Sequence, residues 1–126
     1  NELMDVNREQ SSLYAPCKWN PHCDLYETEN GLMLIMDIAG VTKDEVKVVV
    51  QNNVLSISGT RSEPEVSHKK YIHCLEIDYG TFEKRFILPE TIDTDNVDAR
   101  YENGFLYLVL PLRKDFPTKD IAIRRD

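Results

Sequence analysis

Residues 97–111, VDARYENGFLYLVLP, decide the fold class of this chain. Apolar and polar residues alternate on both sides of Asn103-Gly104, which is the two-residue period of strands with one buried face. Asn-Gly is a strong hairpin signal because both residues tolerate positive φ. Pro111 ends the second strand, since proline cannot donate to a strand ladder. The residues expected to face inward are Val97, Ala99, Tyr101, Leu106, Leu108 and Leu110.

The same pattern runs outward from this hairpin through most of the chain. Short apolar stretches alternate with turn signals about every ten residues, which is typical of an all-β sandwich. We expect strands at residues 23–27, 32–38, 46–51, 55–60, 71–77, 81–88, 97–101 and 105–110. Thr42 and Glu45 have capping-box spacing, which predicts one tight helical turn between the second and third strands.

The length of 126 residues indicates one domain with short extensions. Residues 1–20 show no sustained period, and we interpret them as a flexible N-terminal arm or the remnant of one. The chain begins at Asn1 rather than at a methionine, so we expect part of the natural arm to be missing. Residues 21–112 form the predicted antiparallel β-sandwich, and residues 113–126 a C-terminal extension.

Charge and composition exclude several classes of protein. A net charge of -7 disfavours binding to phosphate backbones and anionic membranes. The longest apolar run is eight residues, far short of the ~20 that span a bilayer. The three cysteines (17, 23 and 74) suit neither a disulfide framework nor a zinc ribbon, and we expect a reducing cytoplasm.

Catalytic and cofactor sites find no support in the residues. No glycine-rich loop precedes a helix, so no phosphate cradle is expected, and we expect no cofactor. Ser56 and Ser58 lack a nearby His and Asp in triad-like order, and His68 lies in a polar loop. The acidic residues mostly occupy solvated positions. We therefore predict a protein that is not an enzyme.

Five motifs in order resemble the small heat-shock protein family, in its bacterial and plant-like form. The central one is A-x-x-x-N-G-x-L, with Ala99, Asn103, Gly104 and Leu106, and it is the signature of the α-crystallin domain. The others are residues 19–27 at the domain entry, Asp37-Ile38-Ala39-Gly40-Val41, L-x-I-x-G-x-R at 55–61 and F-x-R-x-F-x-L-P in outline at 82–89. Ile121-Ala122-Ile123 is similar to the family's I-x-I tail motif, beyond the domain.

Three departures from the family pattern accompany these motifs. Ala39 stands where the family often has proline, and Lys84 where it usually has arginine. Lysine cannot form the bidentate fork of arginine, so any salt bridge made there is altered. Phe105, Tyr107 and Val109 occupy a face where smaller polar residues are common.

The resemblance implies an immunoglobulin-like β-sandwich that holds unfolding client proteins without ATP and assembles from homodimers. It also implies that Ile121 and Ile123 enter an apolar groove on another subunit. The groove residues are Val46, Val48, Val50, Val97, Ala99 and Tyr101. About ten residues reach ~33 Å when extended, enough to cross to a neighbour. Burying two isoleucines is worth roughly 3–6 kcal/mol before the cost of ordering the tail, so the contact is expected to be reversible.

The resemblance further implies that residues 71–77 pair with residues 23–27 of a partner chain, giving a swapped homodimer. An intrachain strand or a loop are the alternatives. The residues concerned are Tyr71, Ile72, His73, Cys74, Leu75, Cys23 and Leu25. His22-Cys23 and His73-Cys74 are matching dipeptides, which raises a metal site or an intersubunit disulfide. Adjacent strand residues face opposite sides, so neither dipeptide chelates well and we expect no metal.

Two other functions compete. A p23-like co-chaperone adaptor shares the fold but lacks both the A-x-x-x-N-G-x-L signature and the I-x-I tail. A secreted immunoglobulin-like recognition domain requires a Cys–Trp–Cys core, whereas Trp19 precedes both Cys23 and Cys74.

Overall fold

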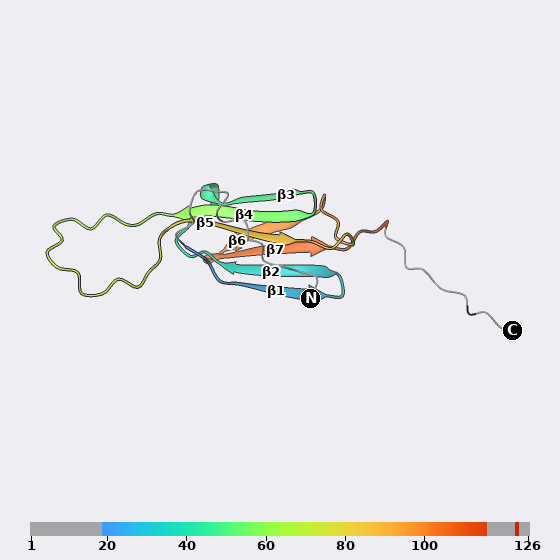
Figure 1. Ribbon diagram of the computed structural model, residues 1–126, viewed down its shortest axis with the longest axis horizontal. Helices are drawn as coiled ribbons and strands as arrows, with labels where there is room; N and C mark the ends of the chain where they lie inside the picture. Colours follow the sequence, from blue (N-terminus) through green and yellow to red (C-terminus); the bar gives the residue numbers. More distant parts are fainter. Residues whose placement is uncertain (1–18, 116–122, 124–126) are drawn as a thin grey trace.

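The computed structural model describes residues 19–115 and residue 123 (Figure 1). Seven antiparallel strands in this part of the chain form two sheets, in the orders β1-β2-β7-β6 and β3-β4-β5. The predicted all-β sandwich is therefore confirmed. The strands are β1 Cys23–Thr28, β2 Gly31–Asp37, β3 Lys47–Gln51, β4 Val54–Arg61, β5 Gly80–Ile87, β6 Asp98–Glu102 and β7 Phe105–Pro111.

The core lies between the inward faces of the two sheets. The alternation read from the sequence is confirmed in β2 and β7, whose even-numbered apolar residues are buried and whose odd-numbered ones are not. Burying each of these side chains contributes roughly 1.5–3 kcal/mol. The side chains with no exposed surface in this core are Leu34, Met36, Ile38, Leu55, Ile57, Leu108 and Leu110.

The hairpin turns form at residues that accept positive φ. Asn103 and Gly104 take φ of 53° and 86°, and Asn52 and Asn53 take 52° and 63°, as hairpins with two left-handed positions require. The predicted turn after Thr42 is the short 3-10 helix η2, Lys43–Glu45. The Thr42 hydroxyl donates to the Glu45 carboxylate at 2.7 Å instead of accepting from the backbone.

Residues 71–77 form no strand within the single chain, which contradicts the intrachain-strand alternative, and their pairing with a partner chain stays a prediction. The whole connection between β4 and β5, residues 62–79, pairs with no strand. Figure 1 shows it projecting beyond one end of the sandwich, while residues 111–115 lie at the other end. A strand needs a neighbour for its backbone donors and acceptors, and no described strand pairs with this segment.

No helix in the described residues combines the length and the apolar character needed to cross a membrane.

Candidate functional site

One side of the sandwich is closed by the segment that precedes β1. The Lys84 ammonium on β5 donates to the Pro21 carbonyl at 3.0 Å, and the Trp19 amide donates to the Thr81 carbonyl at 3.3 Å. The Trp19 ring meets the Phe82 ring edge-on, with centroids 5.1 Å apart. These contacts place the β5 edge over the β1 edge. The other two edge strands, β3 and β6, therefore share the opposite side.

The side shared by β3 and β6 is open and apolar. Val48 and Val50 face inward opposite Ile57 and Leu55, which are fully buried, yet both valines keep exposed surface. Ala99 on β6 faces inward opposite the buried Leu108 and is itself exposed. We call this surface the open edge. We define it by the six residues that the family resemblance assigned to the groove, whose role as a groove stays a prediction: Val46, Val48, Val50, Val97, Ala99 and Tyr101. All of these except Ala99 are partly buried and pack against the core.

Tyr101 secures one end of the open edge. Its hydroxyl donates to the Val41 carbonyl at 2.6 Å and lies 3.2 Å from the Ile38 carbonyl. Both carbonyls belong to the connection between β2 and β3. The bond therefore ties the edge strand of one sheet to the chain entering the edge strand of the other.

The signature residues shape the turn beside Tyr101. Leu106 is buried in the core, and Asn103 and Gly104 form the left-handed turn. A Cβ at Gly104 would lie 3.1 Å from the Cα of Ala39, so the turn packs closely on that backbone. The Ile38 amide also donates to the Gly104 carbonyl at 2.9 Å.

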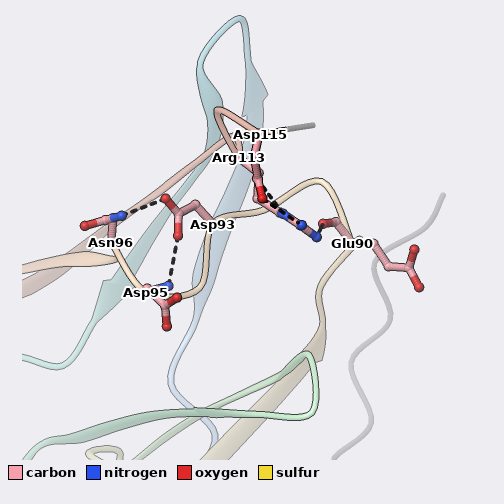
Figure 2. Close-up of polar contacts among 6 residues, drawn as sticks. All are labelled: Glu90, Asp93, Asp95, Asn96, Arg113 and Asp115. Atoms are coloured by element: carbon pink, nitrogen blue, oxygen red, sulfur yellow. Dashed lines mark hydrogen bonds and ion pairs between the residues drawn. The ribbon is translucent and has the colours of Figure 1, made fainter. Parts of the chain in front are cut away.

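The C-terminal extension leaves the sandwich from an anchored start. The Arg113 amide donates to the Thr91 carbonyl at 2.7 Å, and its guanidinium reaches the Glu90 carbonyl at 3.2 Å and both Asp115 oxygens (Figure 2). This pairing raises the pKa of Arg113 and lowers the pKa of Asp115. A polar hollow of about 690 Å³ lies beside it, lined by Asn53, Glu90, Ile92, Asp93, Thr94, Asp95, Asn96, Arg113, Lys114 and Asp115. Of the two tail isoleucines, Ile123 is exposed and Ile121 lies outside the described residues.

The single chain does not bring together the residues expected to exchange between subunits. Cys23 and Leu25 are half-buried on β1, which has β2 as its neighbour and no described strand on its other side. The predicted partners in the 62–79 connection are exposed, with 64% to 77% of the surface of the apolar ones accessible. They are Tyr71, Ile72, His73, Cys74 and Leu75. Such exposure of large apolar side chains is unusual unless a partner covers them.

The described residues hold no group of three or more His, Cys, Asp or Glu side chains placed to bind a metal. Cys23 is half-buried and Cys74 is exposed in the 62–79 connection. The matching His-Cys dipeptides are thus on segments that do not meet within one chain.

Arg61 has a role that sequence reasoning missed. Its guanidinium donates to the Asp78 carbonyl at 2.9 and 2.6 Å and to the Ala39 carbonyl at 3.1 Å. Arg61 is the last residue of β4, and Asp78 lies two residues before β5 begins. The Arg61 side chain therefore joins the two ends of the 62–79 connection, at its base. The signal present in the sequence was an arginine at the end of a strand next to a long loop.

Comparison with known proteins gives a consistent result. Residues 24–124 match the family model described as Hsp20/alpha crystallin family. The small heat shock protein C2 of Rickettsia felis is 30% identical over 82% of this chain and 68% of its own length. A 22.7 kDa class IV heat shock protein of Pisum sativum is 40% identical over 69% of the chain, which spans 45% of that protein. A small heat-shock protein crystal structure from Xylella fastidiosa superposes with a TM-score of 0.72 at 29% identity, covering 86% of this chain and 99% of that one.

Proposed function

This chain belongs to the Hsp20/alpha crystallin family, and we propose that it is an ATP-independent holdase that binds unfolding proteins and limits their aggregation under stress. Small heat-shock proteins are chaperones rather than enzymes. The observation that carries the proposal is the open edge. Its inward-facing apolar residues stay accessible although their cross-strand neighbours are fully buried. Accessible apolar surface of this kind favours binding of exposed apolar segments.

The proposal includes assembly. The Xylella fastidiosa relative has a distinct high-order structure. We infer that this chain also self-associates, with the 71–77 segment adding beside β1 of a partner and Ile121 and Ile123 docking on the open edge of another dimer. The exposed 62–79 connection and the place of β1 at the edge of its sheet, with β2 as its one neighbour among the described strands, support the first contact. The half-exposed valines of β3 support the second. A cytoplasmic location remains a prediction.

Light scattering of a heated, aggregation-prone client tests the function without ATP. Suppression at near-stoichiometric ratios supports the holdase, and added ATP should change nothing. A folded, dimeric protein that suppresses no aggregation would contradict the proposal and favour the p23-like adaptor, which docks on another chaperone.

Two pairs of variants test assembly by light scattering coupled to size-exclusion chromatography. Ile121→Ala/Ile123→Ala should shift large oligomers toward dimers, whereas Thr118→Ala in the same tail should not. Leu75→Asp should shift dimers toward monomers. Val66→Asp is its matched control, because Val66 is exposed in the same connection but outside residues 71–77. Equal masses for a variant and its control would reject that contact.

A further inference from the structure

The outer face of the four-stranded sheet carries an apolar surface that the proposed assembly leaves uncovered. On β7 the outward residues are Phe105, Tyr107 and Val109, with Phe105 39% and Val109 43% exposed. The strand register continues this surface across β2 and onto β1, because Val109 pairs with Met33 and Met33 with Tyr26. We call this surface the outer patch. It consists of Tyr26, Met33, Ile35, Phe105, Tyr107 and Val109.

The other sheet shows that an apolar outer face is no requirement of the fold. Its outward positions are mostly polar or charged, and the apolar exceptions are Val49 and the cross-strand pair Val54 and Ile87. The polar positions are Lys47, Gln51, Ser56, Ser58, Thr60, Thr81, Glu83 and Arg85. A contiguous apolar patch on a surface otherwise built of polar residues usually marks a binding site.

Carboxylates surround the outer patch. The same register places Asp24 beside Ile35, Asp37 and Glu102 beside Phe105, and Asp98 beside Val109, all on the outer face and all exposed. Among the described residues of β1, β2, β6 and β7, this face holds one cation, Arg100, whose guanidinium carbon lies 5.1 Å from the centre of the Tyr107 ring. Four carboxylates against one cation give the rim a negative potential.

These two features together select the ligand. We propose that the outer patch binds segments of unfolding proteins in which apolar side chains are accompanied by Lys or Arg. This inference rests on the proposed holdase function and names the class of client it favours. Apolar side chains would cover the aromatic residues of β7, while the basic residues would approach the surrounding carboxylates.

Two other occupants fit the charges less well. A second copy of this chain stacked on the same face would bring four carboxylates toward four others, and like charges at an interface disfavour association. The chain's own residues 1–18 carry Glu2, Asp5 and Glu9 against Arg8 and Lys18, so they offer no excess of positive charge.

Fluorescence anisotropy of labelled peptides with the full chain tests the proposal. The probes are extended peptides with one apolar pattern, in which the intervening residues are all Lys or all Glu. The Lys peptide should bind at least about tenfold more tightly than the Glu peptide. The ratio of the two dissociation constants should shrink at about 0.5 M salt, where screening is strong. Equal binding of the two peptides would overturn the proposal.

Surface variants locate the site. Phe105→Thr/Val109→Thr should weaken the Lys peptide about tenfold, and threonine suits outward strand positions. Val49→Thr/Ile87→Thr on the other outer face is the matched control and should bind normally. Asp24→Asn/Asp98→Asn should reduce the preference for the Lys peptide over the Glu peptide while leaving the apolar contacts in place. If Phe105→Thr/Val109→Thr does not fold, Val109→Thr alone replaces it. Undiminished binding by the patch variants would overturn the proposal.

The remaining outcomes are also decisive. Concentration-dependent self-association that is lost in Phe105→Thr/Val109→Thr and competes with peptide would assign the patch to a second copy. Tighter peptide binding after deletion of residues 1–18 would assign it to the arm. Either result overturns the proposal. If Phe105→Thr/Val109→Thr suppresses client aggregation as well as the wild type does, the holdase function is supported and the outer patch is rejected as its client site. If the wild type suppresses no aggregation, the holdase proposal is rejected, and the outer-patch proposal that rests on it is rejected with it.

Discussion

The guanidinium carbon of Arg61 lies 3.7 Å from the centre of the Trp19 ring. The same side chain donates to the carbonyls of Ala39 and Asp78, so it joins the segments before β1, after β2 and before β5. An arginine fits this position because its planar group can stack on an aromatic face while its edge donates several hydrogen bonds.

Replacing Arg61 should loosen the base of the 62–79 connection. We expect Arg61→Lys to lower the free energy of unfolding by about 1–2 kcal/mol, because lysine keeps the charge but loses the stacking and the forked hydrogen bonds. Urea denaturation followed by Trp19 fluorescence measures this. Arg100→Lys on the outer face is the control, and equal midpoints for the two variants would contradict the role assigned to Arg61.

Gly59 lies inside β4, and a side chain there would collide with its surroundings. A Cβ would stand 2.8 Å from Phe82 Cε2 and 2.9 Å from the Glu45 carbonyl oxygen. Gly59→Ala should therefore destabilise the fold by about 1–3 kcal/mol, the range for overpacked sites. Thermal unfolding of Gly59→Ala and Ser58→Ala, its outward neighbour, provides the comparison. A Gly59→Ala protein as stable as Ser58→Ala would show that the contact relaxes without cost.

The Tyr101 hydroxyl makes a prediction for the open edge. Tyr101→Phe removes the donor to the Val41 carbonyl and should cost about 1 kcal/mol. Hydrogen exchange should also quicken at the β6 edge, since the tie to the β2–β3 connection is lost. Tyr107→Phe, on the outer face, should leave both quantities unchanged. Identical exchange in the two variants would argue against the tie.

The Arg113–Asp115 pair makes the start of the C-terminal extension sensitive to acid. Arg113 lowers the pKa of Asp115 below its ordinary value of 3.8. The stabilisation of the start of the extension by this ion pair is therefore fully present at pH values above 3.8. Its contribution is lost as pH falls through the lowered pKa, where Asp115 takes up a proton. Arg113 stays protonated throughout.

Carbon-13 NMR titration of the Asp115 carboxyl checks this. The pKa should lie below 3.8 in the wild type and return toward it in Arg113→Gln. Lys114→Gln removes a neighbouring charge without removing the hydrogen bonds, so it should leave the titration nearly unchanged. Similar shifts in both variants would mean that general charge, and not the pair, lowers the pKa.

Local patterns predicted most of the fold. The alternation of Leu106, Leu108 and Leu110 with Phe105, Tyr107 and Val109 identified β7 and its inward face, because successive side chains of a strand point to opposite sides. Asn103-Gly104 identified the turn because few other residues accept two left-handed positions. The structure contradicts only an intrachain strand at residues 71–77, and pairing of this segment with a partner chain stays a prediction. Its apolar alternation favours a strand, but a strand forms only where a neighbouring edge accepts its backbone hydrogen bonds.

The sequence by itself determined seven of the eight expected strands, the turns between them, the inward faces of β2 and β7 and the family, since all of these follow from neighbouring residues and their order. Only the tertiary structure decided which edges stay open and which close. The bond from Lys84 to Pro21 joins residues 63 positions apart and places β5 over β1, which leaves β3 and β6 as the open pair. The register likewise gathered Asp24, Asp98 and Glu102 around one apolar face. Such groupings depend on which strands become neighbours, and that is settled by packing between distant segments.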